Sequence, residues 1–71
     1  MTGTVIRLLP NKGFCFVRGS DGLTRFLHAT QLQPNSAFDT LREGQGVEFE
    51  PVEVPDGKGN KLRAINAKLL E

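Results

Sequence analysis

The residues of this chain with the clearest chemical meaning are aromatic. The chain has 71 residues and five Phe, but neither Trp nor Tyr. Phe14, Phe16 and Phe26 fall within thirteen positions, in the stretches "KGFCFV" (Lys12 to Val17) and "FLHAT" (Phe26 to Thr30). Unpaired bases stack on such rings, and neighbouring Lys and Arg side chains can hold phosphates. These residue types at this spacing indicate a site for a single nucleic-acid strand.

The sequence gives little support for metal binding or nucleophilic catalysis. One Cys and one His, Cys15 and His28, cannot supply a tetrahedral metal site within one chain, and no Ser lies beside a plausible base. We therefore expect no enzyme activity, no metal or other cofactor and no small-molecule substrate. A lone Cys cannot form an internal disulfide, no stretch is apolar enough to span a membrane, and the N-terminus lacks a signal segment. The expected setting is the cytoplasm.

Charge separates the two halves of the chain. Residues 1–42 contain five basic and two acidic side chains, a difference of +3, and residues 43–71 contain four basic and six acidic ones, a difference of −2. Four of the five Phe lie in the basic half. The run "EFEPVEV", with Glu48, Glu50 and Glu53, indicates a solvated acidic face that repels nucleic acid.

Short alternating segments separated by Gly, Pro, Asn and Asp favour one all-β domain over residues 1–71. The expected strands cover residues 3–9, 13–19, 24–29, 46–54 and 61–69. Asp21-Gly22 predicts a hairpin turn in which both residues take positive φ, and "PDGKGN" (Pro55 to Asn60) predicts another. Residues 30–45 form one long connection, with a helical turn near Ser36 to Leu41.

Alternation along these strands sorts the side chains between two faces. The predicted core consists of Val5, Leu8, Cys15, Val17, Leu27, Leu32, Val47, Phe49, Ile65 and Ala67. Five short antiparallel strands leave open edges unless the sheet closes on itself, so we expect a barrel. The reverse assignment, with Phe14 and Phe16 inside, would expose Val17.

The side chains left on the outer surface form the predicted binding site, because a contiguous exposed apolar patch usually marks one. Four of them are expected to stack bases, namely Phe14, Phe16, Phe26 and His28. The backbone of the nucleic acid would be held by Arg7, Lys12 and Arg18. Arg25 shares the inner face with Leu27, so we expect it at a frayed strand end or extended outward.

The same motifs resemble those of the cold-shock domain family, a five-stranded antiparallel OB-fold barrel. "KGFCFV" matches that family's K-G-F-G-F-[IV] motif except at Cys15, and "RFLH" (Arg25 to His28) keeps the Phe and His of its V-F-V-H motif. The opening "GTV" (Gly3 to Val5) and "FDTLREGQGVEFE" (Phe38 to Glu50) extend the resemblance over essentially the whole chain. It implies binding to single-stranded RNA or DNA, often as an RNA chaperone, without catalysis or a cofactor.

The resemblance also brings Phe38 into the predicted site, because the family has a contact aromatic at the matching place. Phe38 lies in the long connection. Two readings stay open: the ring either contacts a base or anchors the connection by packing on the barrel.

The first strand departs from the family pattern. The family's K-W-F-N corresponds to "IRLL" (Ile6 to Leu9), so Arg7 replaces a Trp and Leu8 replaces a Phe. Ala29 stands where an aromatic usually follows the second-motif His. Because each stacking ring is worth about 1–3 kcal/mol, we predict weaker binding and a steeper salt dependence than a full set of rings gives. A guanidinium plane can also stack, so Arg7 would compensate in part.

A rival interpretation comes from a different class of function. In it, the chain is a protein-interaction OB-fold, and Ile6, Leu8 and Ala29 form a docking patch for another protein. A self-associating dimer is one version, so the expected state is a monomer or a weak dimer. Addition of nucleic acid separates the two interpretations, since only the first predicts a response at the aromatic residues.

Overall fold

The computed structural model describes residues 1–55, 57 and 59–70, with the side chains of residues 35–37 and 60 excepted. Its strands are β1 (Thr2–Leu9), β2 (Phe14–Gly19), β3 (Thr24–His28), β4 (Gly46–Pro55) and β5 (Asn60–Leu69). Three short 3-10 helices lie between them, η1 (Pro10–Lys12), η2 (Ala29–Gln31) and η3 (Asn35–Thr40). All five expected strands are confirmed to within one residue at each end, and η3 confirms the helical turn in the long connection.

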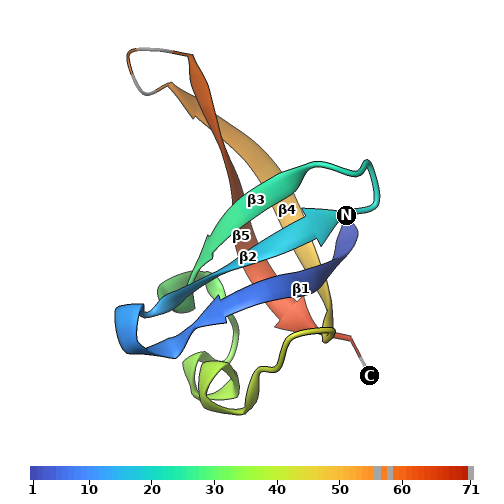
Figure 1. Cartoon of the computed structure of the whole chain (residues 1–71), viewed down its shortest axis with the longest axis vertical. Helices are drawn as coiled ribbons and strands as arrows, with labels where there is room; N and C mark the ends of the chain where they lie inside the picture. The colour runs from blue at the N-terminus through green and yellow to red at the C-terminus, as the bar shows by residue number, and fades with distance from the viewer. Residues whose placement is uncertain (56, 58, 71) are drawn as a thin grey trace.

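The strands close into a barrel in the order β1-β2-β3-β5-β4 (Figure 1). Four of the pairings are antiparallel, and β3 pairs with β5 in parallel through Phe26 with Arg63 and Leu27 with Ala64. The predicted all-β, five-stranded barrel is therefore confirmed, and it departs from a wholly antiparallel arrangement only at this seam. The reason is geometric: directions cannot alternate all the way round a ring with an odd number of strands. Figure 1 also shows the β4–β5 hairpin extending beyond the barrel.

A β-bulge in β1 sets which side chains of that strand face outward. Val5 pairs with Val17 and Arg7 pairs with Phe16, so Ile6 is the extra residue. Such an insertion interrupts the strict alternation of faces. Val5 is consequently buried and Leu8 packs against the core, although they are three residues apart. The same insertion brings the side chain of Arg7 to the outer face.

A second bulge lies in β5, where two residues, Asn66 and Ala67, oppose Phe49 of β4. Asn66 has a φ of 50°, a backbone conformation that Asn tolerates better than most residues. The bulge shifts the inner positions of β5 to Ala64 and Ala67, which are both buried. The prediction that Ile65 belongs to the core is therefore wrong.

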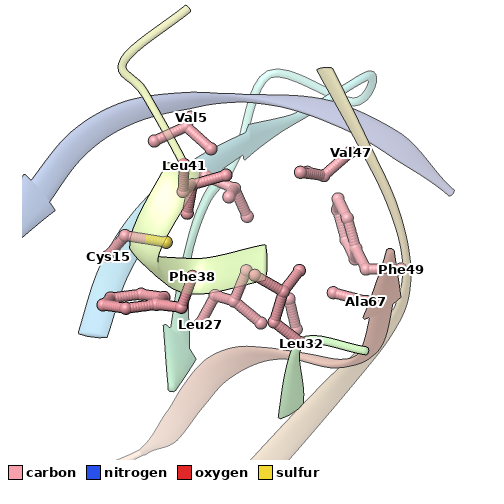
Figure 2. Close-up of a cluster of buried hydrophobic side chains, with 11 residues drawn as sticks. Val5, Cys15, Leu27, Leu32, Phe38, Leu41, Val47, Phe49 and Ala67 are labelled. Atoms are coloured by element: carbon pink, nitrogen blue, oxygen red, sulfur yellow. The ribbon is translucent and has the colours of Figure 1, made fainter. Parts of the chain in front are cut away.

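The core fills the barrel with apolar side chains from every strand and from the long connection (Figure 2). It comprises Val5, Cys15, Val17, Leu27, Leu32, Phe38, Leu41, Val47, Phe49, Ala64 and Ala67. Eight of the ten predicted core residues are confirmed as buried. Phe38 and Leu41 were not among those predicted. Figure 2 shows both projecting into the cluster from the segment around η3.

The β2–β3 hairpin turns through a longer loop than the Asp21-Gly22 pair predicts. The N–H of Gly22 donates to the carbonyl of Gly19 at 2.9 Å, and the N–H of Gly19 donates to the carbonyl of Leu23 at 2.9 Å. Gly22 alone has a positive φ, 83°, so the prediction of positive φ at both residues is wrong for Asp21. The other expected turn lies partly outside the described residues, at 56 and 58, but its flanking residues Pro55 and Asn60 are paired.

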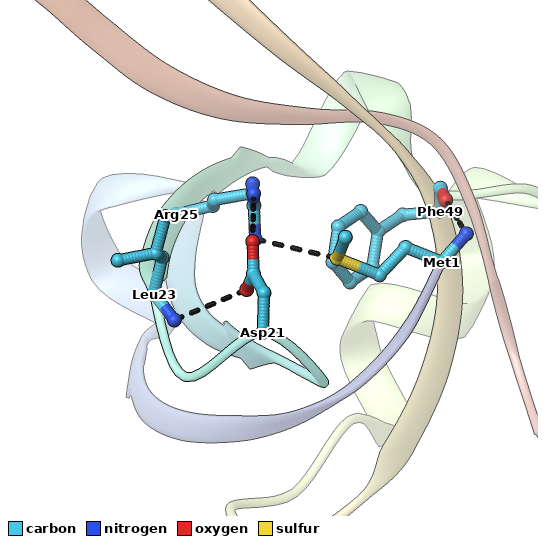
Figure 3. Close-up of polar contacts among 5 residues, drawn as sticks. All are labelled: Met1, Asp21, Leu23, Arg25 and Phe49. Carbon is cyan, nitrogen blue, oxygen red and sulfur yellow. Dashed lines mark hydrogen bonds and ion pairs between the residues drawn. The ribbon is translucent and has the colours of Figure 1, made fainter.

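One end of the barrel holds an ion pair between buried Arg25 and exposed Asp21 (Figure 3). Arg25 is 6% exposed, and its guanidinium donates to both carboxylate oxygens of Asp21, at 2.9 and 2.6 Å. It also donates to the sulfur of Met1 at 3.4 Å and lies over the Phe49 ring, 5.8 Å from the centroid. The expectation that Arg25 lies at a frayed end or extends outward is wrong, because Asp21 supplies the partner that makes burial of the cation possible.

Candidate nucleic-acid interface

A row of four directly paired residues crosses the outer surface of four strands. Arg7 of β1 pairs with Phe16 of β2, Phe16 pairs with Phe26 of β3, and Phe26 pairs with Arg63 of β5. Directly paired residues on neighbouring strands project from the same face of a sheet. This row, which we call the central row, therefore consists of two phenylalanines with an arginine at each end.

Two further residues of the predicted site lie in the next row along the strands, where Phe14 pairs with His28. The centroids of Phe14 and Phe26 are 4.9 Å apart, and those of Phe14 and Phe16 are 5.7 Å apart in an edge-on arrangement. His28 lies 6.2 Å from Phe26. The three phenylalanines and the histidine therefore form one contiguous cluster, which we call the aromatic platform.

The platform faces outward. Phe14, Phe16 and Phe26 are half-buried and His28 is exposed, whereas the residues that alternate with them, Cys15, Val17 and Leu27, have no exposed surface. Phe16 packs edge to face with both Phe14 and Phe26, and the partial exposure of all three rings shows that part of each stays accessible. This leaves surface on which a planar group of similar size can stack.

The imidazole of His28 has a defined hydrogen-bonding state. The backbone N–H of Thr30 donates to Nδ1 at 3.2 Å, and the hydroxyl of Thr30 lies 2.9 Å from the same nitrogen. Because Nδ1 accepts a backbone N–H, the proton of the neutral ring must be on Nε2. His28 therefore offers an N–H donor from Nε2 as well as a ring face.

Basic side chains surround the platform. Arg7 ends the central row, and Lys12 is exposed in η1, two residues before Phe14. Arg18 is exposed on β2, two residues beyond Phe16, and therefore projects from the same face. The structure thus places Arg7 and Arg18 on the same face as the rings and leaves Lys12 exposed just before β2.

Two basic residues of β5, which sequence reasoning did not place there, also lie beside the platform. The guanidinium carbon of Arg63 lies 5.5 Å from the centroid of the Phe26 ring, within the range of a cation–π contact. Lys61 lines a shallow hollow together with Phe14, Phe16 and Phe26. Strict alternation from Ile65 and Ala67 would have turned both cations inward. The bulge at Asn66 turns both side chains to the outer face, and no residue pattern in β5 predicts this bulge.

Phe38 of the predicted site lies elsewhere, and so does the cation Arg25 of β3. Phe38 is 8% exposed and packs in the core, so its position is that of an anchor for the long connection. Arg25 is buried against Asp21. The apolar patch of the rival interpretation is also divided, because Leu8 and Ala29 pack against the core while Ile6 is exposed on the β1 bulge.

The three glutamates of the predicted acidic face lie on β4. Glu48, Glu50 and Glu53 are exposed on β4, the one strand that takes no part in the central row. The predicted acidic face is therefore present, and it lies on a strand distinct from those that carry the platform. The cations Arg7, Arg18 and Arg63 lie instead on the strands of the central row, although the formal net charge is only +1.

Three other features bear on the chemistry of the described residues: metal ligands, the thiol and helical membrane spans. Those residues contain no group of three or more His, Cys, Asp or Glu side chains placed to hold a metal ion. Burial raises the pKa of the Cys15 thiol to about 11, so the thiol stays protonated at neutral pH. No helix of the described residues has the length and apolar character that a membrane span needs.

The amino-acid sequence is similar to those of known proteins. A family model described as the 'Cold-shock' DNA-binding domain matches residues 1–69. The chain is 45% identical over 56 residues to "Probable cold shock protein A" of Mycolicibacterium smegmatis, covering 78% of this chain and 82% of that protein. It is 44% identical over 52 residues to "Cold shock-like protein CspLB" of Listeria monocytogenes, covering 73% and 77%. It is 41% identical over 58 residues to "Cold shock-like protein CspJ" of Salmonella typhi, covering 80% and 81%.

Proposed function

The chain belongs to the cold-shock domain family and is a nucleic-acid-binding protein of that type, and from this premise we propose that it binds single-stranded RNA or DNA across the outer faces of β1, β2, β3 and β5. In this proposal it acts on unpaired strands as an RNA chaperone, from the cytoplasm and without catalysis. One chain supplies the whole site, so a monomer suffices.

The observation that carries the proposal is the contrast between the two faces of β2 and β3. Three phenylalanine rings in mutual contact stay half-exposed, although full burial of a Phe side chain would gain about 1.5–3 kcal/mol. Folding alone does not account for a contiguous apolar cluster held at a water-facing surface. Stacking of bases does, because each base presents an apolar face of matching size.

Each residue then has a distinct role. Phe14, Phe16 and Phe26 stack successive bases, and His28 adds a further ring with its Nε2–H as a donor. Arg7, Lys12 and Arg18 hold the phosphates that run past the rings. Stacking accepts every base, whereas the cations respond only to the backbone, so this combination binds single strands with little sequence preference.

A titration of a labelled heptathymidylate by fluorescence anisotropy tests the proposal. Replacement of both Phe14 and Phe16 by Ala removes two stacking faces, each worth about 1–3 kcal/mol, so the dissociation constant should rise by at least about 30-fold. Leu23→Ala is the matched control, because Leu23 is an exposed apolar residue, at 48%, in the β2–β3 loop. Its affinity should equal that of the unchanged chain.

The thiol of Cys15 reports whether the double variant is folded. Cys15 lies between the two phenylalanines and points into the core with no exposed surface. An intact barrel keeps this thiol protected from an alkylating reagent, and an unfolded one exposes it. Undiminished binding by a folded double variant would contradict the proposed function.

A further inference from the structure

A hollow beside Phe26 contains polar groups that stacking does not require. It lies where β3, η2 and β5 meet and is lined by Phe26, His28, Thr30, Gln31, Arg63, Ala64 and Ile65. We propose that this hollow is a guanine-selective base site, in which Arg63 binds the O6 and N7 edge of a base stacked on Phe26. The inference rests on the proposed function and adds a preference for one base at one position.

The first step concerns the hydrogen-bonding character of the lining. Thr30 N–H occupies Nδ1 of His28, which leaves the Nε2–H of that ring as a donor. The side-chain oxygen of Gln31 accepts the backbone N–H of Asn66 through a long contact of 3.5 Å, so the amide nitrogen is the end of Gln31 that can donate. Arg63 has five N–H donors and no acceptor. Arg63 and the Nε2–H of His28 can therefore only donate to a ligand, and the amide nitrogen of Gln31 adds a further donor.

The second step asks which base edge fits a surface of donors. Guanine presents two adjacent acceptors, O6 and N7. On the same edge, adenine presents N7 beside an amino group and cytosine presents an amino group, so each would place a donor against a donor. Thymine and uracil offer one acceptor, O4, on the same edge. The lining therefore selects guanine over adenine most strongly.

The third step concerns geometry. Arg63 pairs directly with Phe26 across the parallel β3–β5 seam, and its guanidinium lies over that ring at 5.5 Å. A base that stacks on Phe26 takes the place of the guanidinium on the ring. The cation is then left beside the edge of the base, since its backbone is fixed in the neighbouring strand. From there the planar fork can make the two parallel hydrogen bonds that O6 and N7 accept.

The test uses labelled heptanucleotides with three thymidines on each side of a central base. The central base is guanine, adenine, hypoxanthine or 7-deazaguanine, and affinities are compared by anisotropy. Guanine should bind about 5- to 150-fold more tightly than adenine, the range expected of a bidentate arginine–guanine pair. Hypoxanthine keeps O6 and N7 and should match guanine. The 7-deaza analogue lacks N7 and should lose most of the preference.

The variant Arg63→Lys tests whether the planar guanidinium, rather than the positive charge alone, selects guanine. Lys keeps the cation but lacks the rigid planar fork, so the variant should lose most of the preference for guanine over adenine. Arg42→Lys is the control, because Arg42 is exposed in the long connection and lies outside the hollow. It should keep the guanine preference.

The outcomes distinguish this inference from the function on which it rests. Equal affinities for guanine and adenine in the unchanged chain would overturn the guanine site and leave the proposed function standing. A guanine preference that survives Arg63→Lys, or that 7-deazaguanine retains, would also overturn it. Failure to bind any of the four oligonucleotides would overturn both.

Discussion

Arg7 in β1 lies directly across from Phe16 in β2, and the one-residue bulge at Ile6 puts it there. A regular strand that buries Val5 would bury Arg7 as well, two residues on. With the bulge, the side chain at this position extends the aromatic platform instead. The central row therefore ends in a cation where the family pattern has a Trp. We accordingly expect nucleic-acid binding to depend on charge.

Binding to a single strand should depend measurably on salt. If Arg7, Lys12 and Arg18 each neutralise one phosphate, the logarithm of the association constant should fall with the logarithm of salt concentration with a slope of about −2. Lys12→Ala removes one contact and should make the slope shallower by about 0.7. Anisotropy titrations between low and moderate salt measure both. A slope near zero for the unchanged chain would contradict the assignment.

Restoring a ring at position 7 should tighten binding. Arg7→Trp adds a stacking face worth about 1–3 kcal/mol next to Phe16 and removes one phosphate contact. The dissociation constant of a heptathymidylate should fall by about 5-fold or more, and the salt slope should become shallower. Arg42→Trp, at an exposed position of the long connection, is the control and should change neither quantity. If the Arg7 variant binds more weakly, the guanidinium is the better partner at this position.

The ion pair at the barrel end should make stability depend on pH under acid conditions. Hydrogen bonds from Arg25 and from the backbone of Leu23 lower the pKa of the Asp21 carboxyl from 3.8 to about 2. A carboxyl whose pKa is lowered by folding stabilises the native state above its unfolded pKa, and the contribution is lost as pH falls through the folded value. The free energy of unfolding should therefore drop as pH falls from about 4 to about 2. Urea unfolding followed by circular dichroism measures it.

Asp21→Asn is the variant that isolates this contribution. It should be less stable than the unchanged chain at pH 7, because Arg25 stays buried without its charged partner, and its stability should vary less between pH 4 and pH 2. Adding Arg25→Met to the same chain replaces the lone cation with an apolar side chain and should recover part of the loss. Equal pH profiles for the single variant and the unchanged chain would show that the pair does not contribute.

Gly3 should be intolerant of any side chain. A Cβ at this position would collide with the backbone carbonyl oxygen of Arg18 on β2, a group held in the barrel wall. Gly3→Ala should lower the free energy of unfolding by about 1–3 kcal/mol, as overpacking in a closed core does. Gly46→Ala is the matched control, because the nearest atoms to its Cβ would be those of the Leu70 side chain, at an ordinary 3.5 Å. Similar stability of the two variants would contradict the close approach of β1 and β2.

Much of the fold follows from alternation and turn residues alone. The five strands, the buried positions of Cys15 and Val17 and the outward positions of Phe14 and Phe16 are local properties of short periodic segments. The parallel β3–β5 seam follows from closing a ring of five strands and has no local signal.

What sequence reasoning missed depends on contacts between distant residues. The bulge at Asn66 changes the face of Arg63 and Ile65, and it arises from pairing with β4 around Phe49. The burial of Arg25 becomes understandable only when Asp21, four residues earlier, is brought against it by the hairpin. Phe38 enters the core because the long connection folds over the barrel end, a position that its local sequence does not specify.

The most direct measurement of the central claim is an amide chemical-shift titration of the isotope-labelled chain with oligouridylate. The account predicts that the largest shifts occur at Phe14, Phe16, Phe26 and His28, while the amides of the exposed acidic residues of β4, Glu48 and Glu50, move little. Saturating nucleic acid that leaves the four platform amides unmoved, or that shifts β4 instead, would contradict it.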